Sequence, residues 1–103
     1  MSVEEQIRAS VRSDDEAREI RRVIDHGEGS LVQHGESSMS WRRFPDRFHI
    51  MHFAGSLRDF MGCAAHLARE VRRDGIDAIT WDGRREWDAM AERVRRNGQR
   101  GQQ

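Results

Sequence analysis

The chain has 103 residues and a formal net charge of zero, which comes from 18 basic and 18 acidic residues. This length indicates a single domain, and the neutral balance argues against a general binder of nucleic acid or of membrane surfaces. The one cysteine cannot form an intrachain disulfide. The polar N-terminus excludes a signal peptide, and no apolar run is long enough to span a membrane. We therefore expect a protein of a reducing cytoplasm, or of a virus particle assembled in one.

Residues 14–26 have the pattern of an amphipathic helix. Ser13 and Glu16 have the spacing of a capping box, and acidic residues crowd the first turn, where the helix dipole favours them. Apolar side chains then recur at helical spacing: Ala17, Ile20 and Ile24. The capping-box spacing also occurs earlier, at Ser2 and Glu5. We predict a helix over 14–26 that ends in a glycine-rich turn.

Residues 3–12 fit two kinds of structure. Val3, Ile7 and Val11 have the spacing of a helix face. The alternation of apolar residues with arginine and serine fits a strand instead. We favour a strand over 6–12, and both interpretations stay open.

Three strands are predicted next, over residues 30–36, 38–44 and 47–53. The links between them are short, and Pro45-Asp46 is typical of a turn. Both faces of the third strand are largely apolar, so we expect it to be central in the sheet. Regular alternation points Phe48, Ile50 and His52 to one face, and points the intervening side chains to the other. The three strands together indicate an antiparallel meander.

The second half contains a predicted helix over 57–73, a strand over 76–81 and a last helix over 84–97. Ser56 is a natural N-cap for the first of these helices, which carries a wide apolar stripe. A strand, helix and strand in succession imply a right-handed crossover between parallel strands. The predicted fold class is α+β (α/β), in the order (β)αβββαβα, with a mixed sheet flanked by helices. We assign residues 1–98 to one domain and 99–103 to a polar tail.

This order resembles the N-terminal and central parts of the GNAT-type N-acetyltransferase fold. Residues 7–20, IRASVRSDDEAREI, look like the opening strand and first helix of that family. Residues 47–79 look like its central strand, long helix and following strand. Residues 82–90, DGRREWDAM, look like a variant found in short GNAT-like proteins of tailed phages. The likeness covers most of the chain and implies a truncated GNAT-like domain.

The departures from that family concern its cofactor. Catalytic members hold the acetyl-CoA pyrophosphate in a glycine-patterned loop at the start of the long helix, where backbone N–H groups face the phosphates. Residues 54–62 of this chain do not have that pattern, and Asp59 puts a negative charge there. The family's frequent general acid is a tyrosine, and this sequence contains none. The family's two closing strands also have no counterpart. The resemblance therefore implies a fold that has lost its cofactor site, and we expect no cofactor.

Neither metal nor nucleophile chemistry has a matching set of residues. Cys63 and His66 supply two ligands on one predicted helix, which is too few for a zinc site. His52, Ser56 and Asp59 are near each other in the sequence, but a catalytic triad also needs a positioned base and an oxyanion hole. We therefore assign no catalytic, cofactor-binding or metal residue. The expectation is a protein that is not an enzyme, with a residual N-acetyltransferase activity as the alternative.

Every one of the basic residues is an arginine, and six of them lie in residues 84–103 against three acidic residues. Arginine forms bidentate, weakly hydrated contacts that suit protein interfaces. A solvated helix face is the ordinary explanation of such a charge pattern, and a nucleic-acid contact is a further alternative. We assign partner binding to five of these side chains: Arg84, Arg85, Arg93, Arg96 and Arg100.

Together, these observations predict a non-enzymatic structural or interaction protein. We expect a minor virion component of a tailed phage or phage-like particle, bound to other virion proteins and located in the virion or the host cytoplasm. A degenerate acetyltransferase or acyl-CoA-binding protein is the first alternative. A nucleic-acid-binding accessory protein is the second, and no membrane partner is expected.

Overall fold

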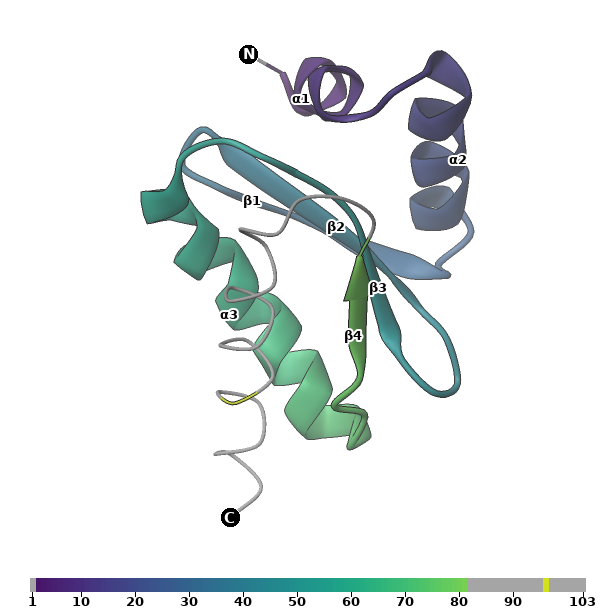
Figure 1. Cartoon of the computed structure of the whole chain (residues 1–103), viewed down its shortest axis with the longest axis vertical. Helices are drawn as coiled ribbons and strands as arrows, with labels where there is room; N and C mark the ends of the chain where they lie inside the picture. The colour runs from purple at the N-terminus through teal and green to yellow at the C-terminus, as the bar shows by residue number, and fades with distance from the viewer. Residues whose placement is uncertain (1, 82–95, 97–103) are drawn as a thin grey trace.

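The structure is a computed structural model that describes residues 2–81 and residue 96. Within these residues the element order is ααβββαβ, with three helices and a four-stranded mixed sheet (Figure 1). The predicted α+β fold class is confirmed at this level. The predicted helix over 84–97 and the tail over 99–103 lie outside the described residues, apart from the helical residue Arg96. No helix of the described part is long and apolar enough to cross a membrane.

The sheet has the strand order β1-β2-β3-β4. Its strands are β1 (Gly29–His34), β2 (Ser37–Arg43), β3 (Phe48–Ala54) and β4 (Ile79–Trp81). The first three form the predicted antiparallel meander, and β4 pairs in parallel with β3, as the predicted crossover requires. Strand β4 is shorter than the predicted 76–81, because only its last three residues pair with β3.

The first helix, α1 (Val3–Ser10), occupies the segment in which alternation favoured a strand over 6–12, so that prediction is wrong. The Ser2 side chain caps α1 by accepting a hydrogen bond from the Glu5 backbone N–H at 3.2 Å. Ile7 is buried in the core, whereas Ala9, which a strand would place on the same face, is exposed. The local capping interaction therefore outweighs an alternation this short.

The second helix, α2 (Asp14–Asp25), confirms the helix predicted from the capping box. The Ser13 side chain accepts a hydrogen bond from the Glu16 backbone N–H at 3.2 Å. Ile20 and Val23 are buried on the face that points to the sheet. Both α1 and α2 contact the same side of the sheet, α1 over β3 and β2, and α2 over β1 and β2 (Figure 1).

The long helix, α3 (Leu57–Asp74), covers the opposite face of the sheet over β1 and β2 (Figure 1). Ser56 is its N-cap, as predicted, and Gly75 ends it in the left-handed conformation with φ 69°. The main core lies between α3 and the sheet and contains Met39, Trp41, Phe48, Ile50, Phe60, Cys63, Ala64, Leu67, Ala68 and Val71.

A β-bulge in β3 distributes its side chains differently from the predicted alternation. Trp41 pairs with Ile50 while the adjacent Ser40 pairs with His52, so Met51 is an extra residue without a partner on β2. Ile50 stays in the core under α3, and His52 turns to the other face beside Ser40. The prediction that His52 shares a face with Ile50 is therefore wrong, because alternation alone contains no information about a bulge.

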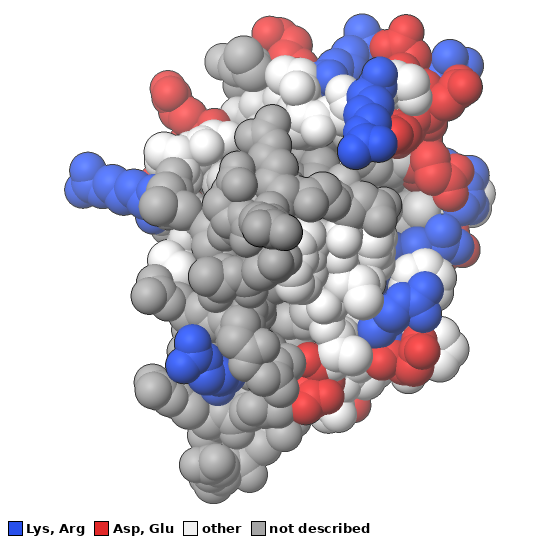
Figure 2. All heavy atoms as spheres, in the orientation of Figure 1, with Lys and Arg blue, Asp and Glu red and all other residues white. Residues whose placement is uncertain are grey.

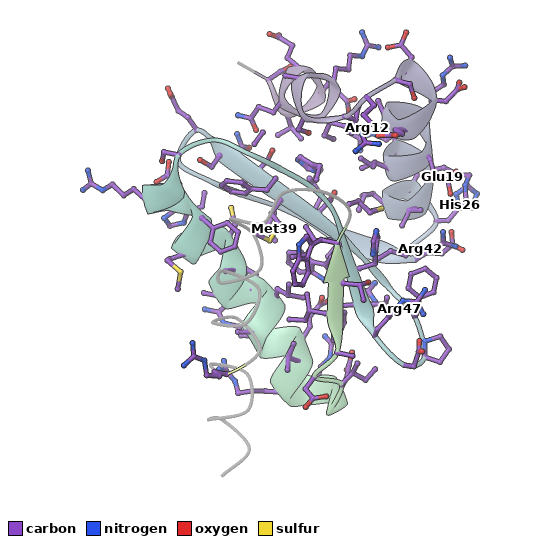
Figure 3. The ribbon with its side chains drawn as sticks, in the orientation of Figure 1. Arg12, Glu19, His26, Met39, Arg42 and Arg47 are labelled. Carbon is purple, nitrogen blue, oxygen red and sulfur yellow. The ribbon has the colours of Figure 1, made fainter. Side chains whose placement is uncertain are left out.

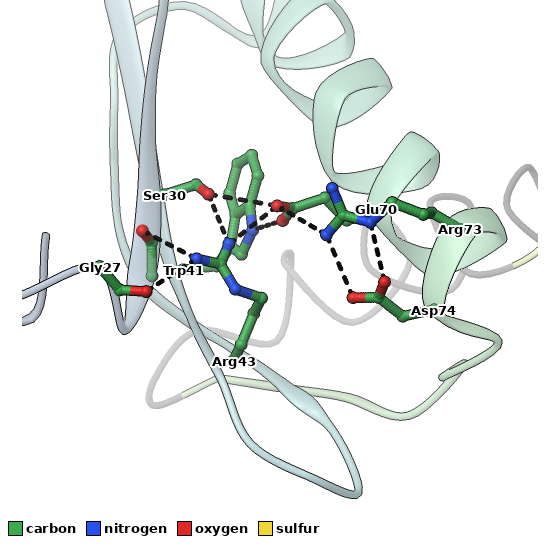
Figure 4. A network of polar contacts seen from close by, with 8 residues as sticks. Gly27, Ser30, Trp41, Arg43, Glu70, Arg73 and Asp74 are labelled. Atoms are coloured by element: carbon green, nitrogen blue, oxygen red, sulfur yellow. Dashed lines mark hydrogen bonds and ion pairs between the residues drawn. The ribbon is translucent and has the colours of Figure 1, made fainter.

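Glu70 on α3 ties the helix to β1 and β2 through a network of polar contacts (Figure 4). Its carboxylate accepts hydrogen bonds from Trp41 Nε1, from Ser30 Oγ at 3.2 Å and from Arg43 Nη1 at 2.8 Å. The Glu70 side chain is 13% exposed, so these contacts are largely shielded from water. Arg43 also donates a hydrogen bond to the Gly27 carbonyl at 3.1 Å, which joins the turn after α2 to the network.

We predict that Glu70→Ala lowers the free energy of unfolding by roughly 2–4 kcal/mol, because it removes the acceptor of Trp41 Nε1 and the carboxylate that pairs with Arg43. The neighbouring Arg69 is exposed, so Arg69→Ala is the matched control and should change stability by less than about 0.5 kcal/mol. Urea denaturation measures both values. Equal stability of the two variants would show that the network does not hold α3 to the sheet.

Candidate functional site

A pocket of about 590 Å³ lies between the α1–α2 connection and the sheet, on the face opposite α3. Its walls combine apolar and polar side chains from three regions of the chain: Ser10, Val11, Arg12, Glu16, Glu19, Ile20, His49, Met51, His52 and Trp81. The bulge at Met51 turns the His52 side chain to this face of the sheet, where both residues line the pocket. The pocket therefore depends on residues that are far apart in the sequence.

Two serines of β2 hold the His52 side chain. Nδ1 of His52 lies 2.6 Å from Ser40 Oγ, and Nε2 lies 3.0 Å from Ser38 Oγ. A neutral imidazole has one donor and one acceptor nitrogen, so one serine accepts a hydrogen bond and the other donates one. His52 is 1% exposed, and burial lowers its pKa from 6.5 to about 4. His52 is therefore neutral at pH 7, with both ring nitrogens occupied.

Other titratable side chains of the pocket also have partners within the chain. His49 Nδ1 lies 2.7 Å from the hydroxyl of the β4 threonine. Glu16 accepts a hydrogen bond from the Arg12 backbone N–H at 3.1 Å. Glu19 accepts hydrogen bonds from Arg22, and that contact lowers the pKa of Glu19. Figure 3 shows Arg12 at the α1–α2 connection and Glu19 further along α2. Both carboxylates therefore take part in hydrogen bonds within the chain.

The N-terminus of α3 is closed by side chains of the chain itself. Ser37 Oγ accepts a hydrogen bond from the Ser56 backbone N–H at 3.1 Å and donates one to Asp59 Oδ2 at 3.2 Å. Gly55 has φ 127°, and a Cβ at this position would collide with Ser37, so the close approach requires glycine. A phosphate at this helix start would meet the negative charge of the Asp59 carboxylate.

The partner-binding arginines can be placed only in part. Arg84, Arg85, Arg93 and Arg100 lie outside the described residues. Arg96 is helical and exposed, as a side chain that contacts a partner must be.

His52 and Cys63, which the sequence offered for catalysis and metal binding, are both buried. Both nitrogens of His52 are held by the β2 serines, so His52 does not act as a base toward Ser56. Cys63 is buried in the core. Among residues 2–81 and 96, no group of three or more histidine, cysteine, aspartate or glutamate side chains could hold a metal ion.

Sequence reasoning missed the structural serines of β2. Ser37, Ser38 and Ser40 are 0% exposed, and each hydrogen-bonds to a side chain of β3 or α3. Buried hydroxyls need partners, so a buried serine-rich strand was a signal for such a cluster. The prediction of a strand over 6–12 left this face of β2 without the covering helix α1, so there was no reason to expect the serines to be buried.

Comparison of the chain with protein-family models, with curated proteins and with solved structures finds no match.

We predict that His52 makes stability depend on pH. Its pKa is lower in the folded state, so its contribution is complete above pH 6.5 and is lost as the pH falls toward 4. The loss between pH 7 and pH 4 amounts to roughly 3 kcal/mol for this residue. Carboxylates in general also take up protons as the pH falls toward 4. The control is therefore His52→Gln, which keeps a neutral hydrogen-bonding side chain that does not titrate. Unfolding curves with the same pH dependence for both proteins would contradict this account of His52.

Proposed function

We propose that the chain is a non-enzymatic, protein-binding subunit with a truncated GNAT-like fold, and that it is a minor virion component of a tailed phage or phage-like particle. The parallel step from β3 through α3 to β4 supports the GNAT-like part of this proposal. Helix α1 is a departure, because it lies where the resemblance of residues 7–20 places the family's opening strand. The phage part rests on the resemblance of residues 82–90 to short GNAT-like phage proteins.

The closed N-terminus of α3 is the observation that carries the non-enzymatic part. In the family that the sequence resembles, this helix start receives the cofactor pyrophosphate. Here Asp59 occupies that position, and its carboxylate is held by Ser37 on the neighbouring strand. A pyrophosphate would be repelled by this carboxylate, and moving it aside would leave the buried Ser37 hydroxyl without its acceptor.

The polar groups of the pocket support the same conclusion. A general base must be within reach of the substrate proton with a free lone pair. His52 has none at neutral pH, because Ser38 and Ser40 occupy both ring nitrogens. The histidine therefore stabilises the fold and does not transfer protons.

A protein partner also fits the charge distribution better than a nucleic acid does. On α2, ion pairs join Arg18 to Asp15, Arg21 to Asp25 and Arg22 to Glu19. Figure 2 shows charges of both signs interspersed over the described part of this side. A nucleic-acid surface is instead a stripe or patch of basic side chains. The contact is assigned to the arginine-rich segment 84–103, in which arginine can form bidentate pairs with acidic groups of a partner.

We predict that acetyl-CoA does not bind to the folded chain. Isothermal titration should give no saturable heat for the wild type, because the Asp59 carboxylate occupies the phosphate position. Asp59→Asn keeps the shape of the side chain and removes its charge, so it tests whether charge alone blocks the site. Saturable binding by the wild type at micromolar cofactor would revive the acyl-CoA-binding alternative.

We predict that the C-terminal arginines contribute to assembly. Deleting residues 95–103 should leave the circular dichroism spectrum unchanged and reduce incorporation of the chain into its particle. The matched pair Arg96→Glu and Arg96→Lys separates charge from geometry, since the second variant keeps the charge but loses the bidentate guanidinium. Quantitative immunoblotting of purified particles measures incorporation. Wild-type incorporation of the deletion variant would show that this segment takes no part in the contact.

A further inference from the structure

The side of α3 that is turned away from the sheet carries a narrow stripe of exposed side chains. Its residues recur at intervals of three or four, which places them on one side of the helix. They are Arg58, Met61, Ala65, Arg69 and Arg72, and all five are exposed. The core residues of the same helix, among them Cys63, Leu67 and Val71, face the sheet instead. These five exposed residues are called the outer stripe of α3 below.

The outer stripe has apolar residues in its middle and arginines at its ends. Met61 is 37% exposed, and it is the only exposed large hydrophobic residue among the side chains that the structure describes. The neighbouring Ala65 is small, so a partner can approach the helix backbone closely at this point. Protein interfaces typically have an apolar centre and a polar rim, and methionine and arginine are enriched in them. The outer stripe therefore has the composition of a contact surface.

The arginines of the outer stripe are not balanced by the carboxylates of their own helix. Those carboxylates have other partners: Asp59 bonds to Ser37 at 3.2 Å, Glu70 to Arg43 at 2.8 Å and Asp74 to Arg73 at 2.8 Å. Within the described part of the chain, neither Arg58 nor Arg69 forms an ion pair. The outer stripe thus carries uncompensated positive charge, and a complementary partner is acidic.

The apolar middle of the outer stripe favours an acidic protein over a nucleic acid. A phosphate backbone pairs with arginines but offers no apolar group to cover Met61. An amphipathic helix offers both, because apolar residues form one stripe and glutamates can flank it. Arg58 and Arg69 are eleven residues apart, which is about 16 Å along the helix axis, or three turns of a partner helix. A helix of that length therefore fits the surface in length and in charge.

We propose that the outer stripe of α3 is a docking surface for an acidic amphipathic helix of a partner protein. Met61 and Ala65 contact the apolar stripe of that helix, and Arg58 and Arg69 pair with its carboxylates. This inference deepens the proposed protein-binding role, on which it rests, and it adds a second surface to the segment 84–103. Its test uses purified components, so failure here is distinct from failure of the chain to incorporate into particles.

The test measures binding of a labelled acidic peptide by fluorescence anisotropy. The probe is a helical peptide of about four heptads, with leucine along its seam and glutamate beside it. The wild type should bind it with a Kd of roughly 10 μM. The double variant Arg58→Gln/Arg69→Gln should bind at least about fivefold more weakly, because it loses two exposed ion pairs. Met61→Gln keeps the length of the side chain and should weaken binding about threefold.

The matched control removes two exposed arginines from the other side of the sheet. Arg8→Gln/Arg12→Gln makes the same change in net charge and should bind the peptide within about twofold of the wild type. Duplex DNA of about 20 base pairs is the second probe and should bind more weakly than the peptide. No saturable binding of the peptide, equal losses in the two double variants, or tighter binding of DNA would each overturn the proposal.

A measurement on the wild type locates the contact without any substitution. The methyl resonance of Met61 should shift as the acidic peptide is added, because this side chain enters the interface. Met39 lies in the core and Met51 lines the pocket on the opposite face, so their methyl resonances are internal controls and should stay in place. A shift of the Met51 resonance with none at Met61 would place the peptide on the wrong side of the sheet and contradict the proposal.

Discussion

One extra residue in β3 determines what each face of the sheet contains. Met51 has no partner on β2, so Ile50 stays in the apolar core under α3 and His52 moves to the opposite face. Without this bulge, the imidazole would enter the core away from Ser38 and Ser40. An unpaired buried polar group costs about 1–3 kcal/mol, so the arrangement would be unfavourable for the histidine and for both serines. The same change of phase places His52 in the lining of the pocket beside α1 and α2.

Polar side chains on both faces of the sheet hold the fold together. Ser38 and Ser40 of β2 hydrogen-bond to His52 on one face of the sheet. Ser37 of the same strand closes the start of α3 through its hydrogen bond to Asp59. On the face covered by α3, the Glu70 carboxylate accepts hydrogen bonds from Trp41 on β2 and from Ser30 on β1. Within the described residues, the side chains of His52 and Asp59 are thus both hydrogen-bonded to serines of one strand. We propose that the chain has a protein-binding role.

The elements with strong local signals were predictable from the sequence. The helices α2 and α3 each begin with a capping serine and continue with an apolar face, so neither depends on distant residues. The segment 6–12 was assigned to a strand because its alternation is short, and the capping contact of Ser2 outweighs it. The parallel pairing of β3 with β4 followed from the strand–helix–strand order, which depends on connectivity and not on individual side chains.

The bulge and the pocket were not predictable in the same way. A bulge is a relation between two strands, here the pairing of Ser40 with His52 beside that of Trp41 with Ile50, and the periodicity of one strand contains no trace of it. The pocket likewise combines the α1–α2 connection with β3 and β4, so it required the tertiary arrangement. The closed start of α3 was half predictable: Asp59 was recognised in the sequence, but its Ser37 partner comes from a distant strand.

The central claim is that the chain is a subunit of a particle and does not act as a free enzyme. Quantitative mass spectrometry of particles purified through a density gradient tests this claim most directly. The account predicts that the chain co-purifies with the particle at a fixed ratio to its major protein, and that this ratio is unchanged by a second gradient. Recovery of the chain only in the soluble fraction of the host lysate, with none in the purified particles, would contradict it.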